Sequence, residues 1–324
     1  MGRARLVDAR LAAIGAGTAA PLIFPFVVHD RFVLNIAVFV ALYTIVAAGL
    51  VLLFGYARQM SFGHAGFYGI GAYVSALIAR DLHVSAWLGI PAGAAAATLA
   101  GYVVGRPILR LRGLSLAMAT FAFGVIANVV FTQLAVTGGA NGLPGIPVPR
   151  IGPVAFDTPG AFYWLAAPIA AATMVVSWNI ARSHVGRALR ALGNSETAAR
   201  AGGIDAAAYK SAVFTYSAGV AGLAGALYAH YLTFVSENSF SIDVSILMVV
   251  MIAVGGMQSL WGAPLGALFL AIVPEYLRQL GGSYAMLLYG LLLTVVFMYL
   301  PGGVVEAAGA LAERMGRWRR RFSN

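Results

Sequence analysis

The sequence contains no cysteine and few charged residues. Only 10% of its 324 residues are charged, against roughly 25% in a typical soluble protein. The absence of cysteine excludes disulfide bonds, thiol catalysis and metal sites built from cysteine. The chain also lacks the pattern G-x-x-x-x-G-K-[ST], so it does not hold ATP in a P-loop. Any energy that its function requires must come from a gradient or from a partner protein.

Apolar residues dominate instead. They make up 60% of the chain, and the mean hydropathy is +0.85. Runs of about 20 apolar residues recur, and a helix of that length crosses a hydrocarbon core of about 30 Å. Because the runs are continuous rather than alternating, they favour helices over a β-barrel. We predict an all-α, polytopic integral membrane protein that forms a single transmembrane domain over residues 1–324.

The apolar runs predict about ten transmembrane helices, the last three of them short or broken. The first run follows a basic N-terminus, as in a secretory signal peptide, but so many spans follow it that we interpret it as a retained helix. Residues 137–160 are rich in glycine and proline and are predicted to form a long external loop. The predicted spans are 11–28, 32–54, 64–80, 86–105, 114–136, 162–181, 211–232, 244–254, 265–280 and 284–300.

The basic residues segregate to one side of this topology. With ten spans and both termini in the cytoplasm, all 21 Lys and Arg residues except Arg31, Arg80, Arg150 and Arg278 fall on the cytoplasmic side, where positive charge accumulates. The net charge of +10 therefore reflects membrane topology. It does not indicate nucleic-acid binding, because no soluble domain remains to display the basic clusters.

One polar segment, residues 183–210, interrupts the apolar runs on the predicted cytoplasmic side. Leu189, Leu192 and Ala199 can share one face of a helix, and the glycines at 202–203 can form the left-handed turn that ends helices. The pattern predicts a short amphipathic helix that the protein presents outward. A solvated connector is the alternative.

A second distinctive stretch, residues 55–73, combines closely spaced glycines with two polar side chains. The glycines resemble a nucleotide-binding fingerprint, but no strand precedes them and no βαβ unit surrounds them. Close helix packing accounts for glycines at this spacing. Ser61 and His64 lie where a helix begins at membrane depth, a position typical of a cavity or a protein contact. We assign Ser61, Gly63 and His64 to a translocation path, with helix packing as the alternative.

Residues 255–267 form a similar interruption near the C-terminus. Gly256, Ser259 and Gly262 belong to it, and we predict a helix-break-helix element beside the same path. Asn128, a polar residue of the fifth span, is also assigned to the path, with a hydrogen bond to a neighbouring helix as the alternative. Glu275 is expected near the outer interface, where hydration suffices to explain it and substrate contact is the other reading.

Glycines recur once more at 219, 222 and 225, which predicts a helix-packing face directly connected to segment 183–210. Within that segment, Glu196 and Arg200 have the i,i+4 spacing of an ion pair on a helix.

These stretches together resemble the permeases of bacterial ABC importers for branched-chain amino acids, the LivM/LivH type. The resemblance extends from about residue 55 to residue 301 and is specific in combination. The residues that carry it are Gly55, Gln59, Ser61, Gly63, His64, Phe67, Gly71, Ala72 and Tyr73, then Gly186, Arg187, Ala191, Asn194, Glu196, Ala198, Ala199, Gly202, Ile204, Tyr209, Lys210, Phe214 and the run 221–229, and finally Gly255, Gly256, Gly262 and Gly266.

The resemblance implies a permease subunit in the bacterial inner membrane that is not itself an enzyme and needs no cofactor. Its implied partners are a second, homologous permease subunit, two cytoplasmic ABC ATPases and a periplasmic substrate-binding protein. Importers of this kind carry an E-A-A…G coupling loop, and here Thr197 separates Glu196 from the alanines. The residues assigned to ATPase coupling are Arg187, Arg190, Glu196, Ala198, Ala199, Arg200 and Gly202.

Three alternatives remain open from the sequence. A carrier or channel driven by a gradient would work alone, but the chain offers few intramembrane acids for it. A membrane-embedded enzyme would need converging acid, base or metal ligands, and no such cluster is evident in the sequence. Permeases of the same type also serve urea and short amides, so the substrate class is open as well.

Overall fold

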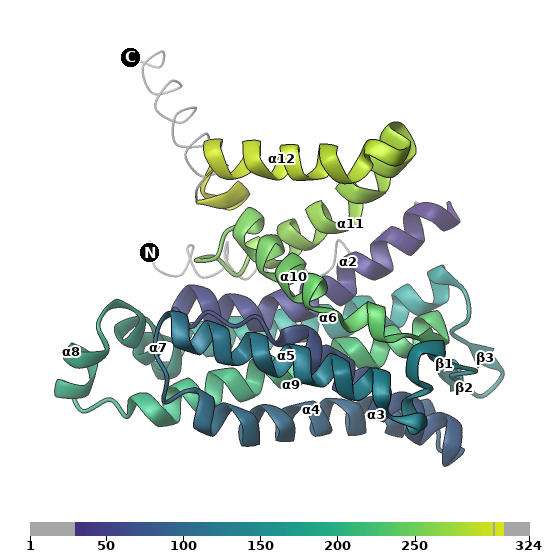
Figure 1. The fold of residues 1–324 in the computed structure, drawn as a ribbon, viewed down its shortest axis with the longest axis horizontal. Helices are drawn as coiled ribbons and strands as arrows, with labels where there is room; N and C mark the ends of the chain where they lie inside the picture. Colours follow the sequence, from purple (N-terminus) through teal and green to yellow (C-terminus); the bar gives the residue numbers. More distant parts are fainter. Residues whose placement is uncertain (1–29, 301, 308–324) are drawn as a thin grey trace, which may run out of the picture.

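The computed structural model describes residues 30–300 and 302–307, in which helices predominate (Figure 1). The predicted first span, 11–28, lies outside these residues. The helices are α2 (Arg31–Leu50), a π-helical turn η1 (Val51–Tyr56), α3 (His64–Asp81), α4 (Ala86–Ile108), α5 (Leu114–Gln133), α6 (Pro159–Arg182), α7 (His184–Asn194), α8 (Glu196–Ala201), α9 (Ala206–Leu232), α10 (Ile242–Gly255), α11 (Gly262–Gly281) and α12 (Ala285–Tyr299).

The described residues include five helices that are long and apolar enough to cross a membrane. They are Arg31–Tyr56, Ala86–Ile108, Leu114–Gln133, Pro159–Arg182 and Ala206–Leu232. Shorter apolar helices occur at Ile242–Gly255 and Leu287–Val296. The all-α membrane class is therefore confirmed, and the total of about ten spans stays a prediction.

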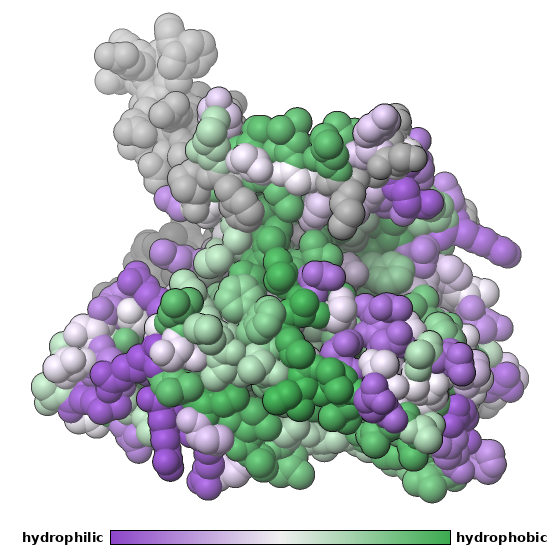
Figure 2. Space-filling view, in the orientation of Figure 1, coloured by the Kyte–Doolittle hydropathy of each residue, from purple (hydrophilic) through white to green (hydrophobic). Residues whose placement is uncertain are grey.

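The surface divides along the long axis of the molecule. Figure 2 shows hydrophobic residues in a broad central band and hydrophilic residues gathered toward both ends. In the same orientation, α7 and α8 form one end, and the small strands β1 (Leu143–Pro144), β2 (Arg150–Ile151) and β3 (Val154–Ala155) lie at the other (Figure 1). The two segments that the sequence predicts on opposite sides of the membrane thus lie at opposite ends of the molecule.

Helix α9 lies at the centre and contacts α2, α3 and α4. Its glycine face brings backbones together: a Cβ on Gly222 would lie 2.1 Å from the Cβ of Ala97, and one on Gly71 of α3 would lie 2.0 Å from the carbonyl oxygen of Gly222. The predicted packing face is confirmed. Because lipid is as apolar as the side chains, such close contacts stabilise membrane helices through dispersion rather than through the hydrophobic effect.

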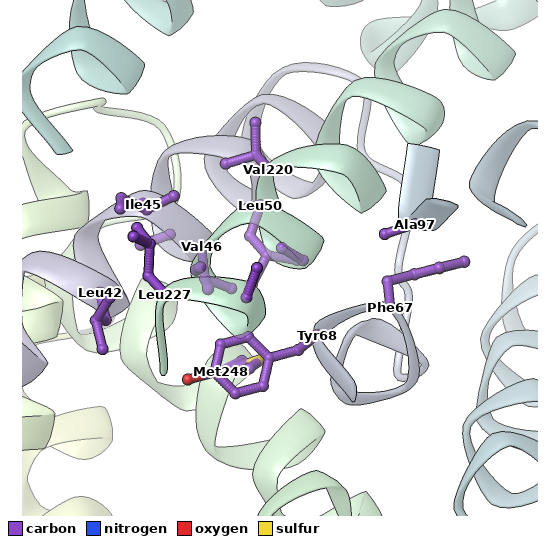
Figure 3. Close-up of a cluster of buried hydrophobic side chains, with 14 of the residues drawn as sticks. Leu42, Ile45, Val46, Leu50, Phe67, Tyr68, Ala97, Val220, Leu227 and Met248 are labelled. Carbon is purple, nitrogen blue, oxygen red and sulfur yellow. The ribbon is translucent and has the colours of Figure 1, made fainter. Parts of the chain in front are cut away.

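The apolar core gathers around α2 and α9. Figure 3 shows Leu42, Ile45, Val46 and Leu50 of α2 beside Val220 and Leu227 of α9, with Phe67, Tyr68, Ala97 and Met248 from the neighbouring helices. The four α2 side chains are fully buried. This core packs α2 against α9.

The predicted external loop, 137–160, contains no α-helix before Pro159. Strand β1 pairs antiparallel with β4 (Phe234–Val235), and β2 pairs with β3. Helix α5 ends at Gln133, three residues before the predicted end at 136, because Thr137 closes a 3₁₀ turn by donating its hydroxyl to the carbonyls of Phe131 (2.6 Å) and Leu134 (2.7 Å).

Buried His230, at the end of α9, attaches this loop to the helices. Its Nδ1 lies 2.7 Å from the carbonyl oxygen of Pro147, and its Nε2 lies 2.9 Å from the hydroxyl of Ser75 on α3. A carbonyl can only accept, so Nδ1 donates to Pro147 and Nε2 of the neutral ring accepts from Ser75. The loop is therefore fixed to α9 by a side chain inside the bundle.

Candidate translocation and coupling sites

The first break in the helices, residues 57–63, follows the π-helical turn and ends where α3 begins at His64. The backbone of Arg58 has φ +48°, which turns the chain out of the helical path. The His64 side chain is 1% exposed and bridges two hydroxyls, with Nδ1 3.0 Å from Ser61 Oγ and Nε2 2.9 Å from Ser217 Oγ. A hydroxyl can donate or accept, so either ring tautomer is satisfied.

Other helices satisfy the backbone that this break exposes. The N–H of Ala65 in the first turn of α3 donates to Ser245 Oγ of α10 (2.9 Å), and the N–H of Phe62 donates to Thr120 Oγ1 of α5 (3.0 Å). The first N–H groups of any helix lack intrahelical partners, and at membrane depth they need protein acceptors. The break is thus held by side chains from α5, α9 and α10.

The second break, residues 256–261, separates α10 from α11 as predicted. Gly256 has φ +118°, a conformation that residues with a Cβ rarely adopt. The π-helical turn before the first break contacts the second break: a Cβ on Gly55 would lie 1.7 Å from the carbonyl oxygen of Met257. The two predicted stretches, 55–73 and 255–267, are therefore in contact.

The path residues are held unequally in this region. Gly63 packs against α5, where an added Cβ would lie 2.4 Å from the carbonyl oxygen of Thr120. Gly262 packs against its own break, 2.4 Å from the carbonyl oxygen of Gly256. Ser259 accepts a hydrogen bond from the N–H of Trp261 (3.3 Å), so its side chain bonds within the break itself.

Asn128 does not join the polar cluster at His64. Its amide donates to the carbonyl oxygen of Glu237 (2.9 Å), which lies in a 3₁₀ turn after β4. On α5 it lies one helical turn beyond Gly124, which contacts Gly63. The observed bond is of the kind that the alternative reading named, to a neighbouring element.

Gln59 belongs to the same break, although it was not among the residues assigned to the path. Its side chain is 3% exposed, and within the described residues neither amide atom has a hydrogen-bond partner. The hydroxyl groups of Thr120, Ser217 and Ser245 were also missed. Their signal in the sequence is slight, since single hydroxyls on apolar helices also bond their own helix.

The polar segment 183–210 forms two helices instead of the single predicted one. The chain leaves the helical conformation at Ser195, which caps α8 by accepting from the N–H of Ala198 (3.3 Å). Helix α8 ends as predicted at the two glycines, with Gly203 at φ +82°. The N–H of Gly203 bonds the Arg200 carbonyl, and that of Ile204 bonds the Ala199 carbonyl, which completes a Schellman motif.

The residues assigned to coupling divide into an outward and an inward set. Helix α7 is amphipathic and buries Leu189 and Leu192, and Ala199 packs beside Leu192. Glu196 also faces inward. The residues that face outward are Arg187, Arg190, Ala198, Arg200 and Gly202.

Glu196 forms the predicted ion pair with Arg200 (2.6 Å) and two further pairs that the sequence spacing does not suggest. Its carboxylate accepts from Lys210 of α9 (2.7 Å) and lies 3.4 Å from Arg112 in the turn between α4 and α5. The hydrogen bond from Lys210, together with the nearby positive charges, holds the pKa of Glu196 below its usual value, although burial acts in the opposite direction. Glu196 therefore fastens α8 to the membrane helices.

Helix α7 also touches the first break. A Cβ on Gly193 would lie 2.5 Å from the carbonyl oxygen of Tyr56 and 3.3 Å from Cγ of Arg58, and the guanidinium of Arg190 lies 5.1 Å from the centre of the Tyr56 ring. The polar segment and the break at His64 are thus in direct contact.

The long apolar helices make this protein a membrane-embedded helical bundle. The family model described as "Branched-chain amino acid transport system / permease component" matches residues 32–297, and the chain belongs to this family. It is 32% identical over 306 residues to the high-affinity branched-chain amino acid transport system permease protein LivM of Escherichia coli K12. The aligned region covers 87% of this chain and 72% of that relative. LivM of Salmonella typhimurium LT2 is 31% identical over the same shares. No solved structure matches the chain. The predicted LivM-type resemblance is confirmed.

Proposed function

We propose that the chain is the permease subunit of an ATP-driven importer of branched-chain or related hydrophobic amino acids. In this proposal it spans the bacterial inner membrane about ten times, with both termini in the cytoplasm. It works with a second, homologous permease subunit, two cytoplasmic ABC ATPases and a periplasmic binding protein. ATP is hydrolysed on the partner subunits.

The contact between α7 and the first break is the observation that supports this function most. A coupling segment must transmit movement to the path, and Gly193 lies against the residues at which the helix breaks, Tyr56 and Arg58. The outward guanidinium groups of Arg187 and Arg200 can bind carboxylates on a partner protein. Glu196 instead holds the segment in position through Lys210 and Arg112.

The mechanism follows from these contacts. When the ATPases close, they displace α7 and α8, and α7 carries the end of the π-helical turn with it. The hydrogen bonds of His64 to Ser61 and Ser217 then exchange partners, and the closed break opens. The second break, locked by backbone contacts between glycines, remains as the fixed wall of the path.

Reconstitution tests this proposal. The chain is purified with its co-purifying subunits and placed in vesicles with the matching binding protein, and leucine uptake and ATP hydrolysis are measured together. We expect the double substitution Arg187→Ala, Arg200→Ala to lower uptake at least tenfold while the protein still inserts. Arg150→Ala, an exposed arginine at the opposite end, serves as the matched control and should transport normally.

The outcomes separate the candidate functions. Coupled uptake at the wild-type rate by the double variant contradicts the coupling role. Uptake by the purified chain without ATP or an ATPase indicates a gradient-driven carrier. Uptake of urea or short amides without leucine changes the substrate class and leaves the transport mechanism standing.

A further inference from the structure

A pocket of about 460 Å³ lies between α2 and α11, separate from the two breaks. Phe32, Ile36 and Phe39 line it from α2, and Leu270, Glu275 and Arg278 line it from α11. The start of α2 and the end of α11 lie at the end of the molecule that carries β1–β3, opposite α7 and α8 (Figure 1). The volume falls within the roughly 300–1,000 Å³ of small-molecule sites.

The wall formed by α11 carries two opposite charges. Arg278 Nη2 lies 2.6 Å from Glu275 Oε1, and Nε lies 3.2 Å from Oε2. This fork leaves Nη1 of the guanidinium outside the pair. The Arg278 side chain is 70% exposed and that of Glu275 is 26% exposed, so the pair is open to a ligand and does not close the pocket.

The rest of the lining is mainly apolar, and its polar members are Asn35 and Tyr43 of α2. Pro274 has no N–H to donate to the carbonyl of Leu270, and both residues line the pocket. Ile36 and Phe39 face them from α2. A ligand that suits this surface has an apolar part and, at one end, adjacent positive and negative charges.

We propose that this pocket binds a zwitterionic α-amino acid with an aliphatic side chain. The ligand carboxylate pairs with Arg278, its ammonium group pairs with Glu275 and the Leu270 carbonyl, and its side chain lies against Ile36 and Phe39. Each charge of the ligand then faces an opposite charge, which offsets the loss of water. The inference rests on the proposed function and adds a substrate site where the amino acid enters the permease.

Binding to the purified full-length chain, without the binding protein or ATPases, tests the pocket. Saturation-transfer NMR and thermal shifts are recorded with L-leucine, with leucinamide, which lacks the carboxylate, and with 4-methylpentanoate, which lacks the ammonium group. We expect leucine to bind at least tenfold more tightly than either analogue. Arg278→Gln should remove that advantage over leucinamide, and Glu275→Gln should remove the advantage over 4-methylpentanoate.

Two further variants separate ligand binding from a structural role. Ile36→Trp should narrow the pocket and weaken the binding of leucine more than the binding of alanine. Simple destabilisation of the protein does not produce such a change in preference. Arg80→Gln breaks another exposed ion pair, with Asp81, and should bind leucine as the wild type does.

Any one of three results would refute the proposal that this pocket binds an amino acid. They are leucine binding within twofold of the wild type in both charge variants, equal binding of leucine and leucinamide, or no effect of leucine on the wild-type chain. If the assembled wild-type system still imports leucine, only the pocket is refuted. If it imports no amino acid at all, the proposed function fails, whatever the purified chain binds.

Discussion

The helix breaks at 57–63 and 256–261 belong to two stretches that contact each other, but they are built differently. Hydrogen bonds hold the break at 57–63: His64 bonds Ser61 and Ser217, and the hydroxyls of Ser245 and Thr120 accept from backbone N–H groups. Glycine backbones in contact hold the break at 256–261, where a Cβ on Gly255 would lie 2.0 Å from the carbonyl oxygen of Gly262. Hydrogen bonds can exchange partners, whereas a steric fit is lost as soon as its parts separate. In the proposed mechanism, the first break therefore moves and the second break stays rigid.

The largest effect is expected where the breaks touch. Gly55→Ala would place a Cβ 1.7 Å from the carbonyl oxygen of Met257, so one backbone must move. We expect a loss of about 3 kcal/mol or more in the free energy of unfolding, at the upper end for overpacking. Thermal unfolding in detergent measures it. Gly290→Ala, on α12 with no atom within 4 Å of the added Cβ, is the matched control and should stabilise slightly. Equal melting temperatures for both variants would refute the steric lock.

His64→Ala should have the next largest effect. It leaves the buried hydroxyls of Ser61 and Ser217 without their partner and opens a cavity, at a combined cost of about 3 kcal/mol. The melting temperature should fall, and hydrogen exchange should rise at 57–63 and not at 256–261. His184→Ala removes an exposed imidazole from α7 and should change stability by no more than about 0.5 kcal/mol. Equal exchange at both breaks in the His64 variant would contradict the division between them.

Ser245→Ala removes one acceptor from the first turn of α3 and should cost about 1 kcal/mol. The exchange rate of the Ala65 amide should rise, because its N–H is left in an apolar environment. Ser211→Ala is the control, because it removes a hydroxyl from α9 at a position away from the break. An unchanged Ala65 amide in the Ser245 variant would show that another group caps α3.

The smallest effect concerns pH. The folded-state pKa of Glu196 is lowered, so its contribution is complete above the unfolded-state pKa of about 4.3 and is lost as the pH falls through the folded-state pKa. We expect α8 to lose protection from hydrogen exchange below about pH 4, by about 1 kcal/mol or less. Glu196→Gln should remove this dependence. If residues 256–261 lose protection at a higher pH than α8 does, the result would argue against a link from the Glu196 segment through α7 to the first break.

The sequence predicted the helices well because continuous apolar runs identify membrane spans. The boundaries differ where polar residues continue a helix beyond the membrane. Helix α9 begins at Ala206, five residues before the predicted 211, because Asp205 caps it by accepting from the N–H groups of Ala207 and Ala208. Hydropathy identifies the apolar part of a helix. It does not identify the polar beginning of α9, which carries Lys210.

The candidate sites were predictable only where they are local in sequence. Spacing on one helix was enough to predict the pair of Glu196 with Arg200. Arg112 and Lys210 approach the same carboxylate only after α4, α5 and α9 have packed together. The pocket between α2 and α11 could not be predicted from the sequence for the same reason, since its two walls are far apart in the chain.

Helix α9 connects the two ends of the protein without interruption. Lys210 holds Glu196 near its start, and His230 holds the carbonyl of Pro147 near its end, roughly 30 Å away at 1.5 Å per residue. Close backbone contacts lie along its middle, such as that between Gly222 and Gly71. A tilt of α9 would therefore displace both Glu196 and the loop at Pro147.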